Sequence, residues 1–211
     1  MLAHTSEQMV YVNLIAGMIA DFSRKTGRQV SVLAPTTGEE RSLGFDGLFS
    51  GLSQGFLIAL QFKRPYPHPT DIAKFTVTKD QCHRLAGWGS LMAGLYVLCP
   101  YVSVTDFLNA GRLTLAHSAF VDCRVVWNSW TGKGKQSRTI TYEQPVGSGV
   151  TKITDPWTYD ELPSQTWDDI IARVQTRDVP LLSREEREQR SADQPTFGGF
   201  GRTFYLHIES D

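Results

Sequence analysis

The chain has 211 residues, of which 41% are hydrophobic and 20% are charged, and these fractions are ordinary for a folded globular protein. This length is enough to bury a core, either as one large domain or as one domain with a substantial appendage. The formal net charge of −1 excludes a global field that would draw the protein to nucleic acid or to an anionic membrane, so any polyanion binding has to come from a local patch.

The first predicted element is a helix over residues 5–25, which Gly27 ends. Apolar residues at helical spacing give it one apolar face, made of Tyr11, Leu14, Ile15, Met18 and Phe22. Helical geometry places Glu7 on that face, one turn before Tyr11. Two interpretations of Glu7 stay open: a first-turn Glu that favours the helix dipole and points partly to water, or a carboxylate aimed at a site.

Three strands are predicted next. Residues 29–34 alternate like a strand, the turn "PTTGEE" follows, and residues 42–49 form a second short strand interrupted at Asp46. Residues 56–63 are the third and most apolar strand. Its alternation places Gln61 and Lys63 side by side on one face, so the strand brings a neutral oxygen and a cation to one spot.

A Pro-rich break over residues 64–70 ends this run. A helix is predicted over residues 78–88, and the apolar residues 95–100 are typical of a fully buried strand. The order helix, three strands, helix, strand indicates an α/β layer with a mixed sheet.

The second half is less regular. Residues 113–130 are predicted to contain one or two strands, "TGKGKQSR" is a small basic turn, and residues 139–146 are expected to form a hairpin with what precedes them. A helix is predicted to begin after Thr166, and a charged segment over residues 183–190 precedes a last strand over residues 202–208. We expect everything after about residue 102 to pack on the sheet, because its strands are too apolar to stand alone in water.

The cysteines Cys82, Cys99 and Cys123 have no zinc-ligand spacing and lie in apolar surroundings, which is typical of reduced, buried thiols. No apolar segment is long enough to span a bilayer, and no signal peptide is predicted at the N-terminus. We therefore expect a cytoplasmic protein with no membrane partner.

Glu7, Asp46, Gln61 and Lys63 resemble the active-site residues of the PD-(D/E)xK nuclease superfamily, in its Mrr-like variant with Gln-x-Lys in place of Glu-x-Lys. The stretches "FDG" at residues 45–47 and "LQFKRP" at residues 60–65 carry the resemblance. The core of that superfamily is a helix, three strands, a second helix and a fourth strand. The resemblance implies a restriction-endonuclease-like core over residues 1–101 around a mixed sheet, with an α/β extension over residues 102–211.

The resemblance also implies a metal-dependent nuclease that acts on DNA more readily than on RNA, of the kind found in defence or mobile-element systems. Mg²⁺ or Mn²⁺ would be held by Asp46, the Gln61 amide oxygen and Glu7, while Lys63 would act on the attacking water and offset phosphate charge. The nucleic-acid backbone would be contacted by Arg64, His68, Lys74 and Gln81.

Other interpretations stay open. Asp46-Gly47 is also a common turn signal, so a purely structural Asp46 is an alternative. Gln61 in place of Glu and the near-neutral net charge are also consistent with an inactive nuclease-fold protein, which would be a nucleic-acid-binding or adaptor subunit of a larger complex or a homo-oligomer. The basic residues Lys133, Lys135 and Arg138 are interpreted as a phosphate contact or a solvated loop. His83 is a candidate to face the site, Trp127 and Trp130 are candidates for base stacking or core packing, and His117 is typical of a satisfied core histidine.

Overall fold

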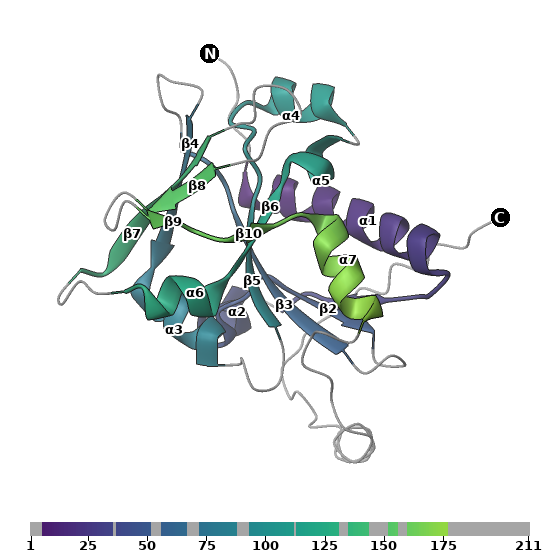
Figure 1. The fold of residues 1–211 in the computed structure, drawn as a ribbon, viewed down its shortest axis with the longest axis horizontal. Helices are drawn as coiled ribbons and strands as arrows, with labels where there is room; N and C mark the ends of the chain where they lie inside the picture. The colour runs from purple at the N-terminus through teal and green to yellow at the C-terminus, as the bar shows by residue number, and fades with distance from the viewer. Residues whose placement is uncertain are drawn as a thin grey trace.

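The computed structural model describes the chain as an α/β protein with two sheets (Figure 1). Its described residues are 6–35, 37–51, 56–66, 72–87, 93–111, 113–130, 135–143, 152–155 and 160–176. The charged segment predicted over residues 183–190 and the last strand predicted over residues 202–208 lie outside them. Within the described ranges, every helix is too short or too polar to cross a membrane.

The predicted first helix is confirmed as α1 (Glu7–Thr26). The Ser6 side chain accepts a hydrogen bond from the Met9 backbone N–H and caps the first turn, and Gly27 ends the helix with a φ of 66°. The apolar face predicted from the spacing is buried along most of its length, through Val10, Leu14, Ile15, Met18, Ile19 and Phe22.

The larger sheet is mixed and has the order β1-β2-β3-β5-β6-β10. Its central pair, β3 with β5, is parallel, and all its other pairs are antiparallel. The predicted strands at 56–63 and 95–100 are therefore confirmed, with the second starting slightly earlier. The bounds are β1 (Ser31–Leu33), β2 (Gly47–Gly51), β3 (Phe56–Lys63), β5 (Ala93–Leu98), β6 (Ala119–Asp122) and β10 (Ser164–Gln165).

The second predicted strand, over residues 42–49, is wrong in its first half. A short helix, α2 (Thr37–Leu43), occupies the segment that looked like a turn and a strand start, and β2 begins only at Gly47. Two acidic residues in the first turn, Glu39 and Glu40, favour the positive end of the helix dipole. Gly44 ends α2 in a left-handed conformation with a φ of 82°, and its N–H donates to the Glu40 carbonyl at 2.8 Å.

The second sheet is antiparallel with the order β4-β7-β8-β9, namely β4 (Ile72–Thr78), β7 (Ser137–Glu143), β8 (Lys152–Asp155) and β9 (Asp160–Glu161). No element was predicted at β4, although Ala73, Phe75 and Val77 alternate inward. The strand predicted over residues 139–146 exists as β7, but its predicted hairpin with the preceding residues is wrong. β7 pairs with β4 and β8 instead.

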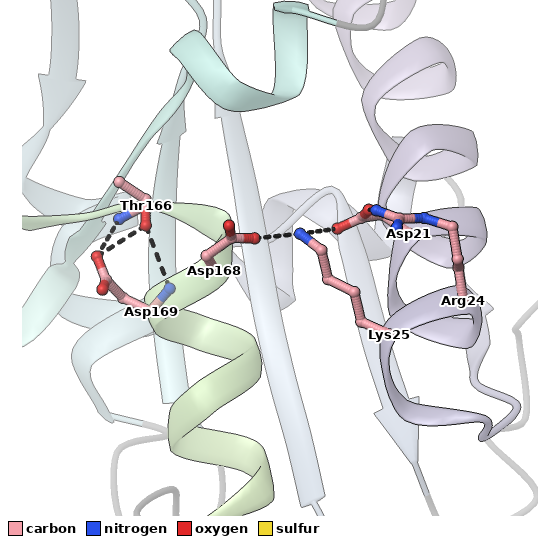
Figure 2. A network of polar contacts seen from close by, with 6 residues as sticks. All are labelled: Asp21, Arg24, Lys25, Thr166, Asp168 and Asp169. Atoms are coloured by element: carbon pink, nitrogen blue, oxygen red, sulfur yellow. Dashed lines mark hydrogen bonds and ion pairs between the residues drawn. The ribbon is translucent and has the colours of Figure 1, made fainter. Parts of the chain in front are cut away.

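Five further helices complete the described fold: α3 (Lys79–Gly87), α4 (Val104–Ala110), α5 (Leu113–His117), α6 (Cys123–Asn128) and α7 (Trp167–Gln175). Residues 113–130, predicted to hold one or two strands, contain the single short strand β6 between α5 and α6. The helix predicted after Thr166 is confirmed, and Thr166 and Asp169 form a reciprocal capping box at its start (Figure 2).

The C-terminal half of α1 is tied to α7 by an exposed ionic network (Figure 2). The Lys25 ammonium lies 2.7 Å from Asp21 on its own helix and also donates to Asp168 in the first turn of α7. Arg24 binds the same Asp21. Exposed pairs of this kind contribute little stability individually, so the main attachment of α7 is the burial of Trp167, Ile170, Ile171 and Val174.

Two cores lie on opposite faces of the larger sheet, and β3 contributes to both. Phe56, Ile58, Leu60 and Phe62 pack with α1 and α7, whereas Leu57 and Ala59 pack with α3, α6 and the second sheet. Every residue of β3 is buried. Gln61 and Lys63 follow the alternation of Leu57 and Ala59 and therefore lie on the side of α3 and the second sheet.

Gly94 marks the tightest described approach between these layers, and we expect Gly94→Ala to lower the free energy of unfolding by about 1–3 kcal/mol. An added Cβ would lie 2.7 Å from the Cys123 Sγ and 2.8 Å from the Leu85 carbonyl oxygen. Gly17→Ala in α1 is the control, because its Cβ would make only an ordinary 3.8 Å contact with Leu115. Urea denaturation should show Gly17→Ala raising stability by about 0.5–1 kcal/mol; equal effects of the two variants would contradict this packing.

Candidate functional site

The site forms where β2 begins and β3 ends. Gly47 pairs with Leu60, and the Asp46 N–H donates to the Leu60 carbonyl at 2.9 Å, so Asp46 continues β2 and lies opposite Gln61. One oxygen of Asp46, Oδ2, accepts from Gln61 Nε2 and from the Phe62 backbone N–H, both at 2.6 Å. The Asp46 carboxyl is therefore held in one orientation at the end of the most buried strand.

Gln61 contributes both a donor and an unused acceptor. Its side chain is 1% exposed, and its nitrogen also contacts the Phe62 carbonyl at 3.3 Å. Its oxygen Oε1 is buried and has no hydrogen-bond partner among the described residues. A buried acceptor without a partner is destabilising, so Gln61 holds Asp46 at a cost in stability.

Glu40 on α2 is the second carboxyl of the site. Burial, a hydrogen bond with the Glu40 carboxyl and the Glu40 charge, in decreasing order, together raise the pKa of Asp46 to about 8. The Phe62 N–H and the Lys63 ammonium act in the opposite direction. Two neighbouring carboxyl groups that hold a proton between them are characteristic of sites built for a cation or for acid–base chemistry.

Lys63 lies on the same side as Gln61, as the alternation of β3 predicts. It is 9% exposed, and its charge favours the ionised form of Asp46. The structure therefore brings together three of the four residues predicted for the site: Asp46, Gln61 and Lys63.

The fourth, Glu7, is exposed in the first turn of α1. The groups that shift the pKa of Asp46 are Glu40, Phe62 and Lys63, and Glu7 is not among them. Tyr11, one turn further along α1, does sense the site: burial and the charge of Asp46 raise its pKa to about 12. Its ring packs edge-on against Phe62 at 5.2 Å between centroids.

Glu40 was not predicted as a site residue, because "PTTGEE" is also typical of a turn. The available signal was local: two acidic residues followed by Gly44 are the start and stop of a one- to two-turn helix.

The predicted nucleic-acid contacts are scattered. Arg64 is exposed and lies 6.0 Å from the centroid of the Tyr66 ring. Gln81 is half-buried on α3, close to the Gly44 turn. Lys74 alternates with the buried Ala73 and Phe75 and therefore lies on the outer face of β4. His68 lies outside the described residues.

The prediction for the basic turn is wrong for Arg138. Lys133 lies outside the described residues, but Arg138 is 2% exposed, so it is neither a phosphate contact nor part of a solvated loop. Its guanidinium donates to the Val126 carbonyl at 3.2 Å and to Ser129 Oγ at 3.1 Å, and it lies over the Trp130 ring. This arginine joins α6 to β7.

The interpretation of His117 as a satisfied histidine agrees with its contacts. Its Nδ1 and the Tyr101 hydroxyl are 2.5 Å apart, and the Tyr142 hydroxyl donates to its carbonyl.

The donor set of the site fits a hard divalent cation with few protein ligands. Within the described ranges, no three residues of the His, Cys, Asp and Glu types gather closely enough to hold a metal. Asp46 and Glu40 supply two carboxyl groups, and the Gln61 amide holds Asp46 in place. Mg²⁺ prefers such oxygen ligands and keeps several waters, so this sparse set suits it.

Comparison with known proteins assigns no family to this chain. The sequence matches no family model and no curated protein. The functional interpretation therefore depends on the residues of the site and on their geometry.

The raised pKa of Asp46 makes stability depend on pH. Between about pH 4 and about pH 8 the folded protein keeps a proton that the unfolded chain releases, so the free energy of unfolding falls as pH rises and then levels off. In Asp46→Asn the amide oxygen still accepts from Gln61 and Phe62, and the new nitrogen donates to Glu40. We expect this variant to be more stable than wild type by about 1–3 kcal/mol at pH 8 in urea denaturation, with the difference vanishing near pH 4.

Asp21→Asn is the matched control with the opposite sign. Burial opposes ionisation of Asp21, but hydrogen bonds from Lys25 and Arg24 outweigh it and lower the pKa. Its contribution is present above the unfolded pKa, so the substitution should destabilise the protein at pH 8 and have no effect in strong acid. The carboxyl pair of Asp46 and Glu40 would be contradicted by one result. This result is a free energy of unfolding that rises between pH 5 and pH 8 by the same amount in wild type and in Asp46→Asn.

Proposed function

We propose that this protein is a metal-dependent nuclease that hydrolyses phosphodiester bonds, in DNA rather than in RNA. The observation that carries the proposal is the Asp46 carboxyl, fixed opposite Gln61, with Glu40 and Lys63 beside it. A carboxyl pair, a buried amide and a buried ammonium at one strand end match the needs of phosphoryl chemistry, which are cation binding and charge neutralisation.

The order of the elements supports the same proposal. A helix, an antiparallel meander of β1, β2 and β3, the helix α3, and the strand β5 parallel to β3 follow the order of the PD-(D/E)xK core. Two insertions distinguish this chain: α2 between the first two strands and β4 before the second helix. The first of these insertions carries Glu40.

The side chains have distinct roles in this proposal. Asp46 and Glu40 would hold Mg²⁺ or Mn²⁺, and Gln61 would orient Asp46 or contribute its oxygen. When bound, the cation neutralises phosphate charge and lowers the pKa of a coordinated water. Lys63, held at the strand end with little exposure, contributes a fixed positive charge to a phosphate oxygen without having to be ordered first.

A second candidate function is binding without hydrolysis, as an adaptor or nucleic-acid-binding subunit. Asp46 Oδ2 already accepts two hydrogen bonds, and Gln61 directs its nitrogen towards Asp46. That arrangement is also what a structural aspartate would show. Metal-dependent cleavage separates the two functions.

Purified protein is expected to cleave DNA with Mg²⁺ or Mn²⁺ and to lose this activity in EDTA. Asp46→Asn should abolish cleavage while raising stability, so the loss cannot be attributed to unfolding. Lys63→Met, which keeps the apolar stem, should slow single-turnover cleavage about 10²–10³-fold with little change in metal affinity. Gel assays on single-stranded and duplex DNA and RNA measure the cleavage rates of wild type and of both variants. A wild-type cleavage rate in Asp46→Asn would refute the site.

Glu40, rather than Glu7, is expected to supply the second carboxylate. Glu40→Gln should weaken Mn²⁺ binding about 10–100-fold in calorimetry, whereas Glu7→Gln, the matched control on α1, should bind like wild type. Gln61→Glu adds a negative charge at the site and should tighten binding. The reverse order of the Glu40 and Glu7 effects would return Glu7 to the site, and unchanged affinity in Gln61→Glu would make Gln61 structural.

A further inference from the structure

The helix α3 lies directly against the turn that leads into the site. Gly44 precedes Asp46 by two residues and has a φ of 82°. A Cβ at this position would lie 3.0 Å from Arg84 Cβ and 3.4 Å from the Gln81 carbonyl oxygen. Arg84 is exposed, and its Cβ lies against the Gly44 turn that leads to Asp46.

Towards α6, the exposed face of α3 carries an aromatic pair. His83 is exposed, and its ring lies 4.7 Å from the ring of Trp127 on α6, centroid to centroid, with a tilt of 38°. Trp127 is partly buried against the core that lies between α3, α6 and the second sheet. The indole is thus held by packing, and it lies against the imidazole of the exposed His83.

Arg84 and His83 share one exposed helix face, and Figure 1 shows α2, α3 and α6 together on one side of the molecule. Arg84 forms no ion pair with a described residue, whereas the guanidinium of Arg124 on α6 is bound by Asp122 at 2.9 Å. Asp80 is the exposed acid on this helix. A cation on α3 beside the turn that leads to Asp46, followed by a stacked ring pair, matches a phosphate followed by a base.

We propose that this strip, defined as Arg84, His83 and Trp127, is a subsite for single-stranded nucleic acid. Arg84 contacts a backbone phosphate, and an unpaired base stacks on the exposed face of His83 with Trp127 behind it. In a duplex both faces of each base are covered by neighbouring bases, so stacking of this kind selects unpaired strands. The inference rests on the proposed function only for placing the scissile phosphate at Asp46; binding to the strip needs no cleavage.

Fluorescence anisotropy in EDTA tests the strip without any hydrolysis. The probes are a labelled 20-nucleotide single-stranded DNA of mixed sequence and the same sequence as a duplex. His83→Ala is expected to weaken single-strand binding roughly 5–100-fold, as the loss of one stacked base would, and to leave duplex binding unchanged. Arg84→Gln should weaken both and reduce the salt dependence by about one phosphate contact.

Two further variants make the result specific. Leu108→Ala on α4 changes a residue that is 62% exposed and far from α3 in Figure 1, and it should bind both probes like wild type. Single-stranded DNA should quench tryptophan fluorescence in wild type and less in Trp127→Phe, because Trp167 is only 3% exposed in the opposite core. Equal losses for both probes in His83→Ala, or no loss in either, would overturn the subsite.

The outcomes also separate this inference from the proposed function. Stacking-dependent binding without cleavage would retain the strip and refute the nuclease. Cleavage that depends on Asp46 but is indifferent to His83 and Trp127 would retain the nuclease and refute the strip. Co-purification of a protein partner that His83→Ala releases, with no DNA binding, would assign the strip to that partner and overturn the nucleic-acid subsite.

Discussion

The two hydrogen bonds that Asp46 Oδ2 accepts, from Gln61 and from the Phe62 backbone, join the start of β2 to the end of β3. This oxygen fixes the orientation of the carboxyl, which fixes where Glu40 can share a proton with it. The hydrogen bond from Gln61 also continues the antiparallel pairing of β2 with β3 one residue beyond the pair of Gly47 and Leu60. The short connection from α2 through Gly44 has to end at that point, and α3 packs against that connection.

The surroundings of the Asp46 carboxyl explain why its ionised form is destabilised in the folded protein. β3 is buried on both faces, so its last residues bring polar groups into a region with little water. The chain compensates only in part: Lys63 and one backbone N–H favour the charged form, but burial and Glu40 outweigh them. A fold that places a destabilised carboxyl at the junction of two strands retains local free energy that ligand binding can release.

The sequence was sufficient for the residues that depend on periodicity. Alternation along β3 is a property of the backbone, so the shared face of Gln61 and Lys63 could be predicted without knowing what covers it. The start of α7 could likewise be predicted, because Thr166 is a favourable N-cap residue.

Glu40 could not be predicted in this way, because α2 is too short for helical periodicity and its contact with Asp46 depends on a turn at Gly44. The pairing of β4 with β7 is likewise set by tertiary packing, since each alternates like any half-buried strand and nothing local selects its partner. Glu7 shows the converse: a correct helical face does not specify how close the end of a helix comes to a neighbouring strand.

The interleaving of the two sheets along the chain has a consequence for synthesis on the ribosome. β4 follows β3 immediately, yet its only ladder partner among the described strands is β7, which emerges much later. β5 pairs with β3 on one edge, but its other edge stays unpaired until β6 has been synthesised. Until those later strands arrive, the nascent chain carries two apolar strands with open hydrogen-bonding edges, which is the condition under which chains pair with one another instead of with themselves. The interval between the synthesis of β4 and that of β7 therefore sets how long the open edge of β4 is exposed to such pairing.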